Sequence, residues 1–231
     1  MAARYALLRL RRGRELGIPD RAQWLHRSCS AILRRMGVTV ERRGTVPSGG
    51  LVVSNHLSYL DVLAYAAVMP CVFVAKSEVR GWPIFGFCAR CAGTVFIDRQ
   101  RRASTDAAAR EIADALRAGV LVVLFPEGTS TDGVALLRFH SALLEPAIDL
   151  QAAITPAAIA WRLPGGQERD LCYYGDVRFA PHLLRTLGRA GIHAEVEFYP
   201  AQLKYVDRKT AALALHEQVE ALRRRMTRGA D

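Results

Sequence analysis

The chain has 231 residues, 51% of them hydrophobic, so it is long and apolar enough to fold around its own core and is not a disordered protein. Its 32 lysine and arginine residues outnumber 22 acidic ones and give a formal net charge of +10, which favours polyanionic partners such as anionic lipid, nucleic acid or an acidic carrier protein. Five cysteines, an odd number without regular spacing, argue against a disulfide framework and indicate a reducing compartment.

The first 35 residues combine many arginines with short apolar runs. Arg11 and Arg12 interrupt the early apolar patch that ends at Leu10, and Gly17 and Pro19 separate two predicted helices. A basic helix with an apolar stripe can lie in a membrane interface, but the stripe can equally pack on the rest of the fold, and the pattern leaves both interpretations open. No secretory signal peptide is evident, and no run reaches the roughly 20 apolar residues of a bilayer span.

Short apolar runs alternate with amphipathic stretches along the rest of the chain. Strands are predicted at 38–43, 51–54, 71–75, 93–97, 120–125, 154–161, 171–177 and 194–198, the last of them half exposed. Helices are predicted at 61–67, from a cap at Ser104 or Thr105 to Gly119, and at 207–228. This alternation predicts an α/β fold with a mostly parallel central sheet flanked by helices. We divide the chain into N-terminal amphipathic helices at 1–35, which could attach to a membrane surface, and one α/β domain at 36–231.

A histidine and an aspartate follow the predicted strand at 51–54. His56 and Asp61 belong to the segment Asn-His-Leu-Ser-Tyr-Leu-Asp, at the kind of strand end where parallel sheets place ligands. A turn and the start of a helix would bring the carboxylate to one imidazole nitrogen, fix the tautomer and leave the other nitrogen as a base. Ser58 could be a nucleophile, but a substrate hydroxyl explains the pair without it. In isolation, this spacing is somewhat more often a capped turn than a catalytic pair.

Two other predicted strands end in residues suited to anions. The strand at 120–125 leads into Phe-Pro-Glu-Gly-Thr-Ser, where backbone N–H groups can hold an oxyanion or phosphate and Glu127 could accept hydrogen bonds from glycerol-like hydroxyls. The strand at 93–97 ends in Asp98 and Arg99, and the Arg99 guanidinium is suited to bidentate phosphate recognition. Taken singly, the segment with Glu127 is a moderately specific signal, because many ordinary strand-to-loop turns also contain such a carboxylate, and Arg99 reads as a surface arginine.

Together these segments resemble the glycerolipid acyltransferase family, the 1-acylglycerol-3-phosphate O-acyltransferases and their relatives in the lysophospholipid acyltransferase superfamily. The resemblance is carried by four segments in the family's order and spacing, at 55–61, 93–99, 125–130 and, more loosely, 154–157. It covers about residues 38–160, and the joint match is far more specific than any single segment.

The resemblance implies that a fatty acyl group passes from acyl-CoA or acyl carrier protein to the free hydroxyl of a lysophospholipid, with 1-acylglycerol-3-phosphate giving phosphatidic acid as the first choice. It implies that His56 is the general base and that Asp61 orients it. The residues expected to hold the acceptor are Arg99, Glu127, Gly128, Thr129, Asn55, Ser58 and, more weakly, Lys76. The thioester is a co-substrate; no further cofactor and no metal are expected.

The resemblance leaves several alternatives. The acceptor could be a lyso-ornithine or another lyso-lipid without a phosphate, or the enzyme could be a CoA-independent transacylase. An alternative of a different functional class is a non-catalytic, basic membrane-binding protein. A third alternative is a metal hydrolase whose ligands would be His56, Asp61, Glu127 and Asp132. The absence of a nucleic-acid-binding signature argues against a nucleic-acid partner. The expected location is the cytoplasmic face of a membrane, peripheral or interfacially anchored, with an anionic membrane surface as a partner.

Overall fold

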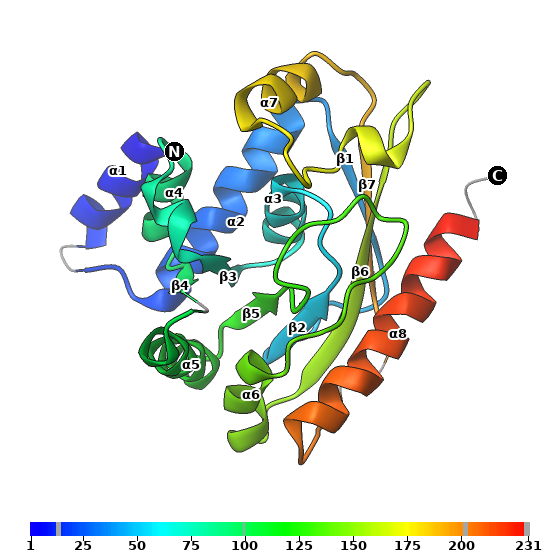
Figure 1. Cartoon of the computed structure of the whole chain (residues 1–231). Helices are drawn as coiled ribbons and strands as arrows, with labels where there is room; N and C mark the ends of the chain where they lie inside the picture. Colours follow the sequence, from blue (N-terminus) through cyan, green and yellow to red (C-terminus); the bar gives the residue numbers. More distant parts are fainter. Residues whose placement is uncertain (13–14, 99, 201–202, 229–231) are drawn as a thin grey trace.

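The computed structural model describes residues 1–12, 15–98, 100–200 and 203–228, and in these residues seven strands form one central sheet (Figure 1). The strands are β1 (Thr39–Arg43), β2 (Leu51–Ser54), β3 (Cys71–Lys76), β4 (Val95–Ile97), β5 (Leu121–Leu124), β6 (Ile154–Arg162) and β7 (His193–Phe198). Their order is β1-β7-β6-β2-β5-β3-β4, and every neighbouring pair is parallel except β6 and β7. The predicted mostly parallel sheet is confirmed.

Helices cover both faces of the sheet, which explains why its central strands are apolar at nearly every position. The helices are α1 (Ala2–Arg12), α2 (Ile18–Arg35), α3 (Tyr59–Val68), α4 (Phe85–Cys91), α5 (Arg102–Arg117), α6 (Glu145–Asp149), α7 (Phe179–Leu187) and α8 (Arg208–Arg228). Side chains alternate along each strand, so Val52 packs with α2 and α3 on one face, whereas Leu51 and Val53 pack with α5, α6 and α8 on the other.

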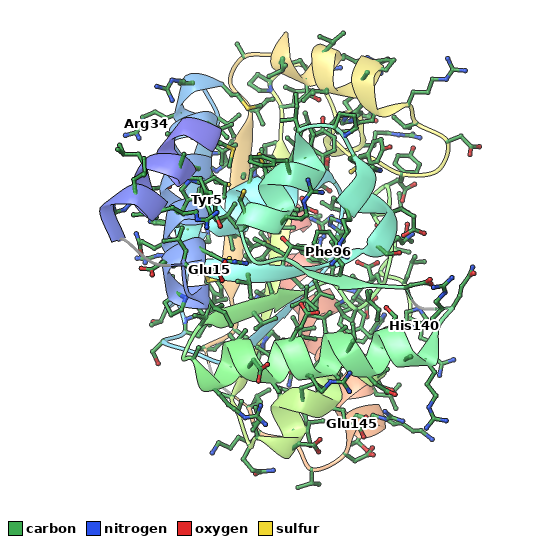
Figure 2. The ribbon with its side chains drawn as sticks, turned by 90° about the vertical axis from the view of Figure 1, so that its left-hand side faces the viewer. Tyr5, Glu15, Arg34, Phe96, His140 and Glu145 are labelled. Carbon is green, nitrogen blue, oxygen red and sulfur yellow. The ribbon has the colours of Figure 1, made fainter. Side chains whose placement is uncertain are left out.

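Helix α2 lies in the main core. Its buried side includes Trp24, Leu25 and Leu33, and His26 Nδ1 lies 2.8 Å from the carbonyl oxygen of Ala66 in α3. Helix α1 lies over α2, where the Tyr5 ring meets the Trp24 ring edge-on with centroids 5.2 Å apart (Figure 2). The predicted boundary after residue 35 therefore does not separate two packing units. No helix in the described parts of the chain has both the length and the apolar composition to cross a bilayer.

Three local predictions are wrong. Residues 171–177 form no strand: Leu171 and Cys172 are buried, but their N–H groups bond to the nearby carbonyls of Glu168 and Arg169. Helix α5 begins at Arg102 and is not capped by Ser104, whose hydroxyl accepts the N–H of Asp98 instead.

Strand β7 is mostly buried rather than half exposed. It lies between β1 and β6, and Glu195, only 1% exposed, forms ion pairs with Arg43 and Arg162 on those strands. The charged position of Glu195 thus reflects ion pairs to the neighbouring strands and not a solvent face. The short helices α4 and α7 were not predicted.

Five strands, β6, β2, β5, β3 and β4, run in the same direction. Their carboxyl ends therefore meet at one edge of the sheet, which is where open α/β sheets bind ligands. Of the segments singled out in the sequence, 55–61 follows β2 and 125–130 follows β5 at this edge, and 93–99 reaches it with Asp98, directly after β4. Lys76, the last residue of β3, lies at the same edge, whereas 154–157 is the start of β6.

Candidate active site

The side chains of His56 and Asp61 meet at the carboxyl end of β2. His56 lies in the loop after the strand and Asp61 in the first turn of α3, and His56 Nδ1 is 2.8 Å from Asp61 Oδ2. The same oxygen accepts the backbone N–H groups of Leu57 at 2.6 Å and Ser58 at 2.9 Å. Because an ionised carboxylate only accepts hydrogen bonds, Nδ1 carries the imidazole proton and Nε2 is left as the basic nitrogen.

The second oxygen of Asp61 has a partner that the sequence did not suggest. Trp161, near the end of β6, donates its indole N–H to Asp61 Oδ1 at 2.7 Å, and both side chains are buried. A buried tryptophan usually donates its indole N–H to an acceptor, and this tendency is the only hint of the contact that the sequence offers. That signal says nothing about which carboxylate the indole would reach.

The Glu127 carboxylate is hydrogen-bonded to the loop that contains His56. Its Oε1 accepts the backbone N–H of His56 at 2.8 Å, and its Oε2 accepts that of Leu137 at 2.9 Å. Burial raises the pKa of Glu127 above its usual range, and the two backbone donors oppose this shift. The next residue, Gly128, has a φ of +76°, a conformation that glycine adopts without strain.

Asn55 and Ser58 are also buried and lie outside the large pocket that reaches His56. Asn55 exchanges two hydrogen bonds with the backbone of Ile159, one at 3.1 Å through Nδ2 and one at 2.9 Å through Oδ1, and so ties β2 to β6. Ser58 precedes α3 and is fully buried. The buried side chains of Asn55, Ser58 and Glu127 do not line the large pocket that reaches His56.

This pocket has a volume of about 590 Å³, within the usual range for small-molecule sites, and its lining is mainly apolar. It runs from His56 between α2, α3, α4 and α7. The Phe125 ring stacks on the His56 imidazole, with centroids 4.2 Å apart and ring planes at 12° to each other, so one face of the imidazole contacts an apolar group. Of the predicted acceptor-binding residues, Lys76, Gly128 and Thr129 line the pocket. Arg99 lies outside the described residues.

A segment beyond β6 closes the site and was missed by the sequence analysis. The N–H of Tyr173 donates to the carbonyl of Leu57 at 2.8 Å, and the Ser130 hydroxyl donates to the carbonyl of Tyr173. Tyr173 also lines the pocket. The loop after β6 is thus joined to both the loop after β2 and the turn after β5. Within the described residues, no group of three or more His, Cys, Asp or Glu side chains could hold a metal ion.

Comparison with known proteins places this site in a family. Residues 37–160, more than half of the chain, match the family model described as acyltransferase. The chain belongs to the acyltransferase family. This confirms the family resemblance, and with it an enzyme that transfers acyl groups.

Two curated relatives of this acyltransferase illustrate the family. The chain is 35% identical to a lyso-ornithine lipid O-acyltransferase of Brucella abortus (strain 2308), over 94% of this chain and 86% of the relative. It is 36% identical to a 1-acyl-sn-glycerol-3-phosphate acyltransferase of Neisseria gonorrhoeae, over 66% of this chain and 60% of that relative.

A solved structure shares the fold. The crystal structure of the 1-acyl-sn-glycerophosphate (LPA) acyltransferase PlsC from Thermotoga maritima matches with a TM-score of 0.67 and 19% identity, covering 90% of this chain and 81% of that one. At this identity the match concerns the architecture, a mostly parallel sheet flanked by helices.

Proposed function

We propose that the chain moves a fatty acyl group from acyl-CoA or an acyl carrier protein thioester to the free hydroxyl of a lyso-lipid. The observation that carries this proposal is the His56–Asp61 pair at the wall of a large apolar pocket. A free imidazole nitrogen beside space for an acyl chain suits a base that activates a lipid hydroxyl. The names of the relatives, which act on lyso-lipids, support the same acceptor class.

In the proposed reaction, His56 Nε2 takes the proton of the acceptor hydroxyl while its oxygen bonds to the thioester carbonyl carbon. The carbonyl oxygen becomes an oxyanion, which collapses as the C–S bond breaks. The leaving thiolate takes the proton from the imidazolium, which restores His56. The Asp61 carboxylate, 2.8 Å from Nδ1, holds the tautomer and stabilises the imidazolium. No covalent acyl-enzyme is needed.

The remaining site residues divide into two groups. We assign acceptor contacts to Lys76, Gly128 and Thr129, which line the pocket, and keep Arg99 as a phosphate ligand on the sequence pattern alone. For Asn55, Ser58 and Glu127 we propose support of the loops in place of the substrate contacts expected from the sequence, because they are buried and hydrogen bonds of Asn55 and Glu127 end on the backbone.

Two acceptors are candidates. A phosphate acceptor, 1-acylglycerol-3-phosphate, suits the exposed Lys76 at the pocket and would give phosphatidic acid. A lyso-ornithine lipid is favoured by a different observation: the relative from Brucella abortus matches 94% of this chain, compared with 66% for the relative from Neisseria gonorrhoeae.

The test is thiol release from palmitoyl-CoA and from palmitoyl-acyl carrier protein, with either acceptor or with none. We expect acceptor-dependent release by the wild type and by His193→Ala, and loss of nearly all release in His56→Ala. His193 in β7 is a suitable control because its ring contacts Thr39 and Glu41 of β1 and does not line the pocket. Product analysis with each acceptor then decides between them. Release that does not depend on any lyso-lipid, or that survives in His56→Ala, contradicts the proposal.

We also propose that the mouth of the pocket meets an anionic membrane surface. Exposed apolar side chains lie on three helices around it, on α1 (Leu7), at the start of α4 (Ile84) and on α7 (Leu187), and Ile84 and Leu187 also line the pocket. In Figure 1, α1 and α4 lie at the left of the molecule and α7 at its top. Exposed arginines on them can add about 1 kcal/mol each near anionic headgroups. A lyso-lipid could then enter the pocket from the bilayer.

A further inference from the structure

The Asp61 carboxylate is held at both of its oxygens. Oδ2 receives His56 and two backbone N–H groups, and Oδ1 receives the indole N–H of Trp161 at 2.7 Å. Among the described residues, Trp161 is the only side chain besides His56 with a hydrogen bond to this carboxylate. Asp61 is 0% and Trp161 2% exposed, so water does not compete for this bond.

We propose that Trp161 is a positioning residue for the His56–Asp61 pair. The rotation of a carboxylate about its last bond has only a broad preference, so a carboxylate held at one oxygen can turn away from its partner. A donor on Oδ1 fixes the carboxylate plane, which keeps Oδ2 in line with His56 Nδ1. Because an indole N–H only donates, Trp161 can hold Oδ1 without accepting a proton itself. This role rests on the proposed function of His56 as a base.

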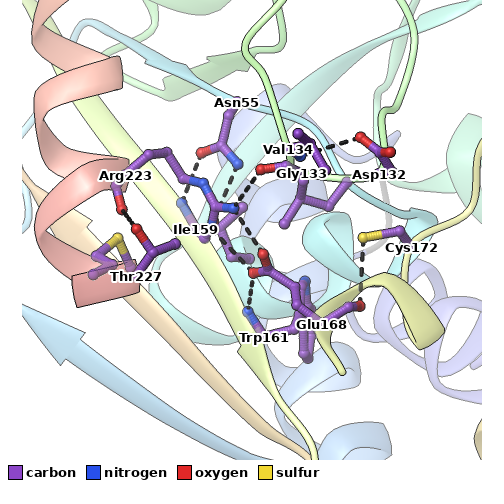
Figure 3. Close-up of polar contacts among 12 residues, drawn as sticks. Asn55, Asp132, Gly133, Val134, Ile159, Trp161, Glu168, Cys172, Arg223 and Thr227 are labelled. Atoms are coloured by element: carbon purple, nitrogen blue, oxygen red, sulfur yellow. Dashed lines mark hydrogen bonds and ion pairs between the residues drawn. The ribbon is translucent and has the colours of Figure 1, made fainter. Parts of the chain in front are cut away.

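Trp161 is itself held by an ion pair that reaches the helix α8 (Figure 3). The backbone N–H of Trp161 donates to Glu168 Oε1 at 2.8 Å, and the Arg223 guanidinium binds both oxygens of Glu168, at 3.0 and 2.7 Å. Arg223 is buried and also donates to the carbonyls of Ile159 at 2.9 Å and Gly133 at 3.3 Å. One cation thus joins α8, β6 and the loop after β5 behind Trp161.

This arrangement distinguishes Trp161 from Trp24, the other deeply buried tryptophan. Trp24 is 4% exposed and lies in α2, but its indole nitrogen has no hydrogen-bond partner in the described structure and it does not line the pocket. Replacement of either residue by phenylalanine keeps an aromatic ring in the core. Only Trp161→Phe removes a hydrogen bond to Asp61.

The first test compares kcat and KM of Trp161→Phe and Trp24→Phe with those of the wild type. We expect kcat of Trp161→Phe to fall about 10- to 100-fold, the range found when a partner that orients an active-site group is lost, with KM for donor and acceptor within about twofold. Trp24→Phe should keep the wild-type kcat. A folded Trp161→Phe with wild-type kcat overturns the proposal, and so does an equal loss in both variants.

The pH dependence of kcat/KM distinguishes a positioning role of Trp161 from a loss of packing, because a loss of packing alone would not shift the midpoint of its acidic limb. Without the indole donor, the charge of Asp61 acts more strongly on His56, so the acidic limb of kcat/KM should move to higher pH in Trp161→Phe. The other ionisable groups that act on Asp61 are Tyr65, Glu127, Cys172 and Arg223, and the substitution leaves all four in place. An unchanged midpoint contradicts the proposal.

A second measurement needs no variant to fold. The indole ¹⁵N–¹H signal of Trp161 in the wild-type protein should shift with pH at the midpoint of the acidic limb of kcat/KM, whereas that of Trp24 should not. A Trp161 signal that is constant through this midpoint overturns the proposal even if the enzyme is active. If neither acceptor supports thiol release, the proposed function fails, and comparison of the indole signal with the pH titration of the His56 ring protons still reports whether Trp161 senses His56.

Discussion

Hydrogen-bond donors, not cations, compensate the two buried carboxylates of the site. Asp61 accepts from the imidazole, two backbone N–H groups and one indole, and Glu127 accepts from two backbone N–H groups. A buried carboxylate is tolerated when its oxygens accept enough hydrogen bonds. Each N–H group that donates to it then needs an oxygen without a hydrogen in that position. An amide in either position would place an N–H₂ group against an N–H donor.

The isosteric change Glu127→Gln tests this dependence. The amide can accept from only one of the N–H groups of His56 and Leu137, so the other is left buried without a partner. We expect the free energy of unfolding to fall by about 1–3 kcal/mol, the usual result of stranding a buried donor. We also expect kcat to fall, because the backbone of His56 loses the hydrogen bond that holds it in position. Urea unfolding and thiol release measure the two effects.

The matched control is Glu217→Gln, on the exposed side of α8. It should leave both stability and turnover at the wild-type level. Wild-type stability and turnover in Glu127→Gln would show that the loop after β2 does not depend on this carboxylate.

At the scale of elements, α7 is attached to the site through aromatic rings. Tyr59, the first residue of α3, packs edge-on against Phe179 and His182 of α7 and against Tyr173, with centroids 5.0 to 5.6 Å apart. His182 Nδ1 also lies 3.0 Å from the Tyr59 hydroxyl oxygen. Because Tyr59 lines the pocket and follows the loop of His56, a shift of α7 changes the shape of the pocket.

This attachment should weaken in acid. Burial lowers the pKa of His182 below its usual value of 6.5, and the charges of Arg185 and Arg189 act in the same direction. The unfolded chain therefore binds a proton near pH 6.5 while the folded protein stays neutral at this position until lower pH. Stability from His182 is present above about pH 6.5 and is lost as the pH falls through the folded pKa.

We predict that the unfolding temperature (Tm) of the wild type falls more steeply than that of His182→Gln as the pH is lowered from 7.5 to 5. The glutamine side chain of this variant keeps an acceptor for the Tyr59 hydroxyl but has no group that titrates in this range. Scanning calorimetry across the range measures the difference. Parallel curves for the two proteins would show that His182 does not couple pH to the packing of α7.

The sequence predicts the centre of the sheet well because the central strands are buried on both faces. Runs such as residues 51–54 and 120–125 are apolar throughout, and each is followed by a polar segment that leaves the core. Helices α4 and α7 escape prediction because they are short and carry exposed apolar residues, including Phe87 and Leu184. Such residues break the periodic pattern on which a helix prediction depends.

Within the site, local sequence predicts only what is close along the chain. His56 and Asp61 are five residues apart, so a turn and a helix start suffice to bring them together. Trp161 reaches the same carboxylate from β6, which lies next to β2 only in the folded sheet. No pattern in the sequence specifies that pairing. The backbone partners of Asn55 and Glu127 escape prediction for the same reason.

At the scale of the whole molecule, the opening of the pocket and the exposed apolar surface coincide. Leu7 and Leu10 of α1 and Leu184 and Leu187 of α7 are exposed, and Leu187 lines the pocket. Exposed apolar groups that rim a binding pocket are typical of an interaction surface. The proposed membrane contact therefore involves α7 as well as the N-terminal helices.

The double change Leu184→Ser and Leu187→Ser should weaken binding to anionic liposomes at least tenfold without a loss of stability, because both side chains are exposed and leave no cavity. Liposome sedimentation at low and high salt measures the binding. Leu213→Ser on α8 is the control, since Leu213 is 69% exposed, close to the 71% of Leu184. Equal binding by the double variant and the control would exclude α7 from the membrane contact.

The position of β2 in the sheet also affects how the enzyme is made. This apolar strand, at residues 51–54, pairs with β5 and β6, both of which are synthesised long after it. Until residue 162 has emerged from the ribosome, β2 lacks at least one neighbour and exposes backbone groups that other chains can pair with. We expect nascent chains of this enzyme to need chaperones during that interval, and rapid overexpression to produce aggregates before folding is complete.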